Sequence, residues 1–193
     1  MIGSDKADGY SDASFAGLSE QEKERAFELL LNELPWSIKW LFVLDAEKAA
    51  EVARQKEDGL RGKDGADVYM LQQQLVKYTG DLRYQAHMIE DYQQYRAKVR
   101  PLVVDAIDRT PTNQAKIDFF KKMLLVEVSK SALSRAARHL LDAIQFPRST
   151  DADEAEYIRL IDDLRSESCE ARKSALDEIA KYETAFFANG HHT

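Results

Sequence analysis

Apolar residues recur every three or four positions along most of this chain, and that spacing restricts its fold more than any other feature. Side chains at this interval line one face of an α-helix, whereas a half-buried β-strand requires strict alternation. Only 4 Pro and 8 Gly occur in 193 residues, so the many turns of a sandwich or barrel have no support. The sequence therefore predicts an all-α protein. Its longest pattern holds eight apolar or aromatic residues in ten positions: Val68, Leu71, Leu75, Tyr78, Leu82, Gln85, Ile89, Tyr92, Arg96 and Val99.

The first helix is predicted to follow a flexible arm at residues 1–17, which is rich in Gly, Ser and Asp. Ser19 and Glu22 form a capping box, in which the hydroxyl accepts from a free helix amide and the carboxylate reaches back to the cap amide. Pro35 ends this helix or starts the next, because proline lacks a backbone donor and suits a first turn.

Four more helices are predicted after the first. We favour a helix that continues through Gly80, since the apolar frame is unbroken there; the alternative is a break, with Asp81 capping a new helix. For the turn near Pro111 the candidate caps are Thr112 and Asn113, and for the last helix Asp151 and Asp153. The predicted ranges are 36–56, 67–100, 113–146 and 151–187.

Helix length then predicts the architecture. At 1.5 Å per residue, a helix of about 33 residues is about 50 Å long, so three of them cannot form a sphere. We expect an elongated antiparallel bundle of about five helices, three of them long and coiled-coil-like. It occupies a single domain at 18–188, followed by a disordered tail at 189–193. If the long helices are broken, the alternative is a stack of helical hairpins, and Leu160–Ala180 is similar to one hairpin of HEAT type.

Composition restricts the function classes. With 27 Lys and Arg against 34 Asp and Glu, the net charge is −7, whereas a general nucleic-acid binder normally has a basic excess. The single Cys169 excludes an intrachain disulfide and a cysteine-cluster zinc site, and it fits a reducing, cytoplasmic compartment. The longest apolar run, Trp40–Leu44, is far shorter than the ~20 residues that span a bilayer, so no membrane partner is expected.

The charges are unevenly distributed. Residues 96–138 carry ten Lys or Arg and four Asp or Glu, which gives 10 − 4 = +6, and residues 151–178 carry four and ten, which gives 4 − 10 = −6. We favour neighbouring helices that complement each other. The alternative is a basic surface that binds an acidic partner or nucleic acid.

Two histidines suggest a possible site for chemistry. His87 precedes Glu90 by three residues, and His139 precedes Asp142 by three, so each pair lies on one helical face. If the two helices are antiparallel about a turn near residue 111, both pairs approach each other as a metal-binding or phosphate-handling site. The apolar frame places His87 and Glu90 away from the core, however, and the chain has no Glu-x-x-His. We therefore expect no metal and no cofactor, and keep these four residues as secondary candidates.

The sequence favours a non-catalytic function over an enzyme. Tyrosines and tryptophans provide large contact area with few rotatable bonds, and they are enriched at protein interfaces. We expect a protein-binding module, such as an adaptor, an inhibitor or immunity-type protein, or a structural subunit, and its long apolar seams make a homo-oligomer plausible. The partner is another protein of unknown identity; nucleic acid bound at 96–138 is a less favoured alternative. The predicted interface residues are Trp36, Trp40, Tyr84, His87, Tyr92 and Tyr95.

Overall fold

The protein is all-α in a computed structural model that describes residues 9–63 and 65–188. Within those residues 73% of the structure is helical, ten α-helices are present and there is no strand. The predicted fold class is therefore confirmed. The chain forms two compact units, residues 1–94 and 95–193, and each is described by itself.

The expectation of about five helices, three of them long and coiled-coil-like, is wrong. Four of the predicted helices each contain at least one break, and the resulting helices are 7 to 20 residues long. Because each piece turns back on the one before it, the units consist of helical hairpins, which was the alternative reading of the sequence.

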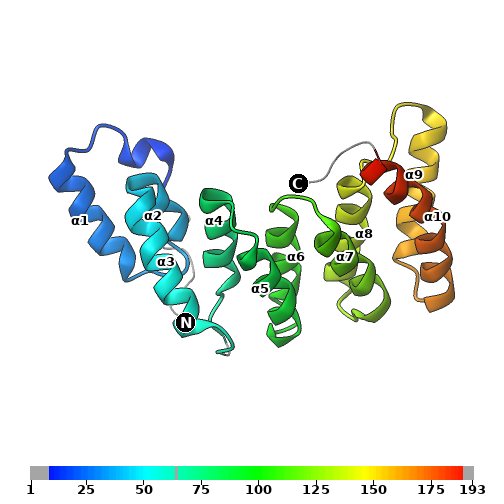
Figure 1. The fold of residues 1–193 in the computed structure, drawn as a ribbon, viewed down its shortest axis with the longest axis horizontal. Coiled ribbons are helices and arrows are strands. Elements are labelled where there is room, and N and C mark those ends of the chain that lie inside the picture. Colours follow the sequence, from blue (N-terminus) through cyan, green and yellow to red (C-terminus); the bar gives the residue numbers. More distant parts are fainter. Residues whose placement is uncertain (1–8, 64, 189–193) are drawn as a thin grey trace. The chain divides into compact units, whose positions relative to one another are not determined.

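The first unit contains five α-helices that follow one another back and forth (Figure 1). Consecutive helices pack against each other, and α2 also contacts α4. The core residues Phe27, Leu41 and Leu71 are at most 1% exposed, and burial of each side chain contributes about 1.5–3 kcal/mol. The bounds are η1 Asp12–Phe15, α1 Glu20–Leu31, α2 Ile38–Leu44, α3 Ala46–Leu60, α4 Tyr69–Thr79, α5 Arg83–Asp91 and η2 Tyr92–Gln94.

Two residues break predicted helices of the first unit. Asp45 has an extended backbone (φ −154°), and its carboxylate accepts from the amide of Lys48, so it ends α2 and caps α3. Gly80 adopts a left-handed conformation (φ +71°) and ends α4. Continuity through Gly80 is therefore wrong. The predicted capping box of Ser19 and Glu22 is confirmed at the start of α1.

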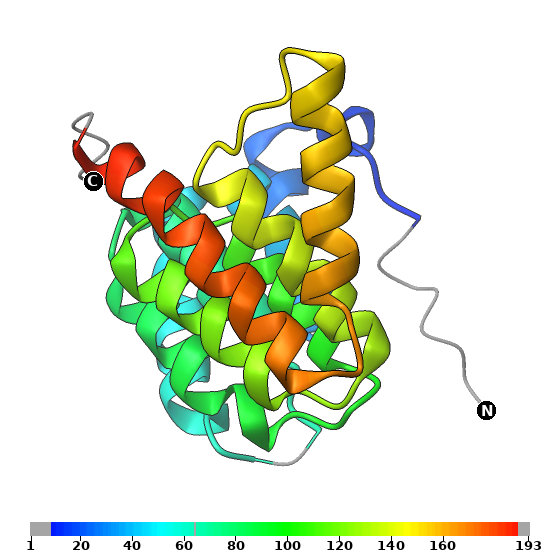
Figure 2. The ribbon, with the colours of Figure 1, turned by 90° about the vertical axis from the view of Figure 1, so that its right-hand side faces the viewer.

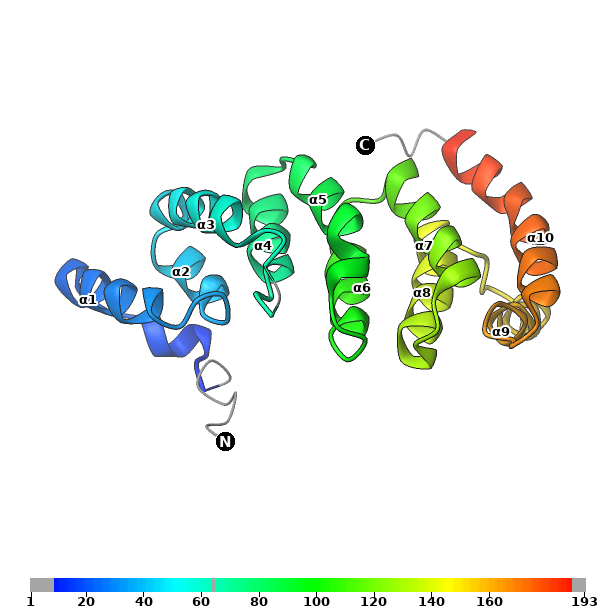
Figure 3. The same cartoon turned by 90° about the horizontal axis from the view of Figure 1, so that it is seen from below.

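The second unit contains the other five α-helices. Figure 3 shows α7 beside α8 and α9 beside α10, and contacts between α6 and α8 and between α7 and α10 complete the packing. Its core includes Ile107, Phe120 and Leu141, each fully buried. The bounds are α6 Arg100–Asp108, α7 Gln114–Val126, α8 Lys130–Ala143, α9 Asp151–Leu164 and α10 Cys169–Ala188.

Short polar side chains cap the first turns of α7, α8, α9 and α10 in this unit. Ser129 breaks the predicted 113–146 helix by accepting from the amide of Ala132, and Ser168 accepts from the amide of Ala171 in the first turn of α10. Asn113 caps α7, as one of the two predictions had it. The cap of α9 is Thr150, whereas Asp151 and Asp153 were expected; Asp153 completes its capping box.

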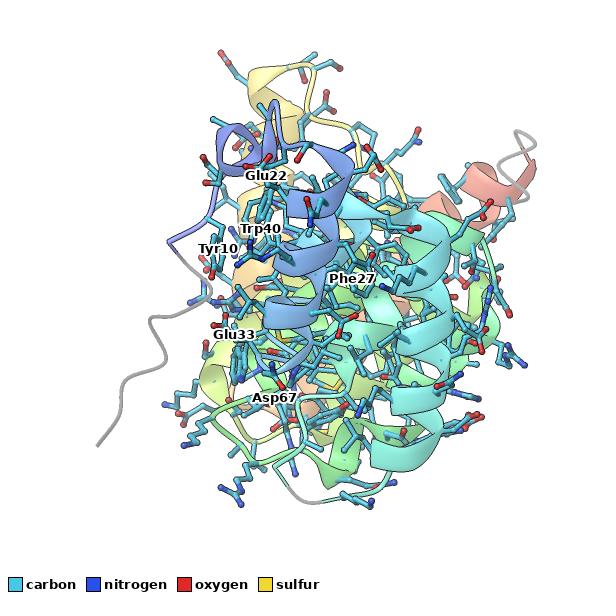
Figure 4. All side chains as sticks on the ribbon, turned by 90° about the vertical axis from the view of Figure 1, so that its left-hand side faces the viewer. Tyr10, Glu22, Phe27, Glu33, Trp40 and Asp67 are labelled. Carbon is cyan, nitrogen blue, oxygen red and sulfur yellow. The ribbon has the colours of Figure 1, made fainter. Side chains whose placement is uncertain are left out.

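The described part of the predicted arm contains a contact with the first unit. Residues 1–8 lie outside the described residues, but η1 follows them, and the rings of Tyr10 and Phe15 lie 6.2 Å and 5.5 Å from the ring of Trp40. Figure 4 shows Tyr10 close to Trp40. The expected tail at 189–193 also lies outside the described residues, and the single domain at 18–188 stays a prediction. Among the described helices, none is long and apolar enough to cross a membrane.

Two glycines in similar surroundings should respond to alanine with opposite signs. A Cβ at either Gly80 or Gly59 meets no atom within 4 Å. Gly80→Ala forces a side chain into the left-handed region and should lower the free energy of unfolding by about 1 kcal/mol. Gly59→Ala, inside α3, should raise it by about 0.5–1 kcal/mol. Urea denaturation measures both, and equal effects would contradict the break at Gly80.

Candidate functional site

Three of the six predicted interface residues belong to the core of the first unit. Tyr84, Tyr92 and Trp40 are 3%, 2% and 7% exposed, so none of them presents its ring to a partner. Tyr92 is itself a position of the apolar seam, so helical spacing alone predicts its burial. Trp36 is 45% exposed between α1 and α2, and Tyr95 is half-buried in the second unit.

His87 belongs to a buried polar network that joins three helices. Its Nδ1 lies 2.8 Å from Oε1 of Glu57 on α3, and Nε2 of Gln72 on α4 donates to the same oxygen at 2.8 Å. The Glu57 side chain is 1% exposed. A buried carboxylate is costly unless it is hydrogen-bonded, so this network fixes how α3, α4 and α5 pack.

Glu90 lies beside a second link between α3 and α5. Arg61 donates from Nε to Asp91 at 2.7 Å and pairs with Glu90 through Nη2. The two carboxylates raise the pKa of Arg61, chiefly through the hydrogen bond to Asp91. Glu57 contacts His87, and Arg61, four residues later, contacts Asp91, which is also four residues later. Because the contacts progress in the same direction along both helices, α3 runs parallel to α5.

His139 occupies a similar position in the second unit. Its Nε2 lies 2.9 Å from Oδ1 of Asp105, and its Nδ1 lies 3.3 Å from Oδ2 of Asp108, both on α6. Arg135, one turn earlier on α8, also pairs with Asp105. These bonds connect α6 to α8, which run parallel with α7 returning between them.

Burial controls the titration of this second cluster. Desolvation lowers the pKa of His139, and the charges of Asp108 and Asp142 oppose that shift. Desolvation likewise lowers the pKa of Lys116, which is 3% exposed and donates to the carbonyl of Thr110 at 2.9 Å. Lys116 thereby satisfies free carbonyls just beyond α6.

The four secondary metal candidates are divided between the two units. His87 and Glu90 lie in the first unit, His139 and Asp142 lie in the second, and each ring is bonded to carboxylates of its own unit. The carboxylates at His139 approach opposite ring nitrogens, so their oxygens do not converge on one point. In residues 9–63 and 65–188, no group of three or more His, Cys, Asp or Glu is arranged to hold a metal.

The basic segment 96–138 is only partly neutralised within its unit. Lys121 pairs with Glu183 and Lys130 with Glu167, and Arg135 pairs with Asp105 inside the segment itself. Lys122 and Arg138 are exposed on α7 and α8. The Lys130–Glu167 ion pair therefore joins the basic segment to the acidic segment 151–178, as expected for helices whose charges complement each other. Other cations of the basic segment remain at the surface.

A surface cleft of about 490 Å³ lies in the second unit, where two turns meet. Figure 2 shows the α7–α8 turn and the α9–α10 turn side by side at one end of their helices. The cleft is lined by Glu127, Val128, Lys130, Leu133, Asp162, Arg165, Ser166, Glu167 and Arg172. Val128 is 84% exposed, whereas Leu133 is 7% exposed, so the cleft combines an apolar projection with an apolar wall.

Some charged side chains of the cleft have ion-pair partners and others do not. Glu127 accepts from the amides of Val128 and Ser129 at 2.8 Å and 2.7 Å and pairs with Arg100, and its side chain is fully buried. Lys130 pairs with Glu167 at 3.0 Å. In the described part of the chain, Arg165 and Arg172 lie within ion-pair distance of no carboxylate, and the buried Nε of Arg172 has no hydrogen-bond partner.

Sequence reasoning did not find this cleft. Val128 and Arg165 were read as positions inside two continuous helices, where they would lie far from any turn. The available signal was in the caps: Ser129 and Ser168 are short polar residues, and each is followed by a new apolar helix. No protein-family model, characterised protein or solved structure matches this chain.

Glu57→Ala should destabilise the protein by about 3 kcal/mol, because it leaves the buried amide of Gln72 and the partly buried ring of His87 without their carboxylate partner. Glu51→Ala is the matched control: it removes the same side chain from the exposed face of α3 and should change stability little. Thermal and urea unfolding measure both. Equal losses would show that the Glu57 network does not hold the helices together.

Proposed function

We propose that this protein is a non-catalytic protein-binding module and that it binds its partner at the cleft of the second unit. The observation that carries the proposal is Val128, which projects from the α7–α8 turn at 84% exposure beside a cleft of about 490 Å³. Isolated exposed apolar residues are common, but one at the edge of a cleft with mixed charges has the composition of an interface core and rim.

The lining supports a peptide segment as the occupant better than a small metabolite. Leu133 and Val128 offer apolar contact, and they are surrounded by positively charged arginines and negatively charged carboxylates. A polypeptide presents apolar side chains, backbone amides and carbonyls together, and each group finds a complement in this cleft.

The His139 cluster supports the same reading, because its bonds hold α8, which carries Lys130 and Leu133 of the cleft. His139 has carboxylates at both ring nitrogens, and His87 shares Glu57 with Gln72. The His139 contacts hold α8 within the second unit, whereas the His87 contacts act within the first unit. We keep the cytoplasm as the proposed location, on the evidence of the single, exposed Cys169.

Val128→Asp should abolish partner binding and leave stability unchanged, because the side chain is exposed in the free protein. Ile158→Asp is the matched control: Ile158 is 53% exposed on α9, outside the cleft. Both variants and the parent chain are used as bait, with quantitative mass spectrometry of the captured proteins. The expected result is a protein retained by the parent and by Ile158→Asp but lost with Val128→Asp.

Capture that is insensitive to Val128→Asp would overturn the cleft as the binding site. Recovery of a second copy of this chain, sensitive to Val128→Asp, would identify self-association as the function of this surface. Tight binding to generic RNA that both variants retain would favour the basic surface at 96–138 instead.

A further inference from the structure

We infer that the cleft between the α7–α8 and α9–α10 turns recognises an acidic peptide segment, in which carboxylates bind Arg165 and Arg172 and an apolar side chain contacts Val128 and Leu133. This inference rests on the proposed function and names the chemistry of its partner. It is carried by the charges of the cleft that are left unpaired.

The first step is the account of the cleft's anions. Glu127 is engaged by Arg100 and two amides, so its buried charge is already compensated. Glu167 is engaged by Lys130. Of the three carboxylates that line the cleft, only Asp162 therefore stands against the two arginines, and the unpaired charge in the cleft is positive.

The second step is the state of Arg172. A guanidinium donates through five N–H groups in a fixed planar arrangement that matches a carboxylate. The Nε of Arg172 is buried without a hydrogen-bond partner, although buried donors are almost always satisfied. A carboxylate in the cleft would pair with the Arg172 guanidinium through charge-assisted hydrogen bonds, which are about twice as strong as bonds to the neutral carbonyl of an uncharged peptide.

The third step concerns the rest of the cleft. Lys130 and Glu167 are both 87% exposed and neutralise each other, so the positive charge that a ligand meets comes from Arg165 and Arg172. The cleft also adjoins the N-terminus of α10, whose partial positive charge favours an anion. Val128 favours an acidic peptide over a free anion, because only the peptide has an apolar side chain that can contact it.

The chain offers a closely matched pair of variants. Arg172 lines the cleft, and its neighbour Lys173 is exposed on α10 outside it. Arg172→Gln and Lys173→Gln remove the same charge one residue apart, so a general electrostatic effect would change both equally. Arg165→Gln tests the second arginine.

The test is fluorescence anisotropy with a labelled peptide in which one leucine lies between pairs of glutamates, compared with its glutamine counterpart. The full chain should bind the acidic peptide at least tenfold more tightly than the glutamine peptide. Arg172→Gln should weaken acidic-peptide binding about tenfold, the size of one lost charge-assisted hydrogen bond, while Lys173→Gln should change it less than twofold. Circular dichroism confirms that each variant is folded.

Failure of this inference differs from failure of the proposed function. If both peptides bind equally and Val128→Asp abolishes both, the cleft binds protein but does not select acidic segments. If neither peptide binds and Val128→Asp leaves captured partners unchanged, the proposed function fails as well. If single-stranded RNA binds more tightly than the acidic peptide and Arg172→Gln weakens it, the class of partner is wrong.

Discussion

The two units depend on bonds between parallel helices that are two apart along the chain. Isolated helices of this length are marginally stable in water, so each needs its neighbours to bury an apolar face. Apolar burial alone is tolerant of sliding and rotation. A hydrogen bond between a carboxylate on one helix and a histidine on the next parallel helix does not tolerate such movement. A shift would break the bond and leave a buried polar group without a partner. Glu57 with His87, and Asp105 with His139, provide this restraint in the first and second unit respectively.

The fold class was predictable because the three-to-four-residue spacing of apolar residues is the same whether a helical segment is continuous or divided into shorter helices. The caps at Ser19 and Asn113 were predictable for the same local reason, since each precedes an apolar pattern. The breaks at Asp45 and Ser129 were missed, and the break at Gly80 was the less favoured alternative, because each new helix also needs an apolar face and its stripe resumes nearly in phase. Periodicity reports that helices exist, whereas a hydrogen bond from one side chain decides where each one begins.

The candidate site could be predicted much less well. Tyr84 and Tyr92 were assigned to an interface by residue type, yet their rings fill the core, because an aromatic side chain serves both purposes. His87 and His139 were recognised as belonging with carboxylates, but the partners Glu57 and Asp105 are 30 and 34 residues away in sequence. The cleft requires two turns to meet, and neither turn exists in a chain of long continuous helices.

The α7–α8 turn shows how a short polar segment can hold an apolar residue in solvent on a fixed backbone. Glu127 is fully buried, which is unfavourable for a carboxylate, but it accepts from the amides of Val128 and Ser129 and from Arg100. These bonds fix the backbone of the turn while directing Val128 into solvent. A rigid turn loses little conformational entropy when a partner binds, so ordering the loop offsets little of the binding free energy from contacts with Val128. The buried carboxylate thus stabilises the fold and presents the apolar residue, which explains why a polar turn interrupts an otherwise continuous apolar stripe.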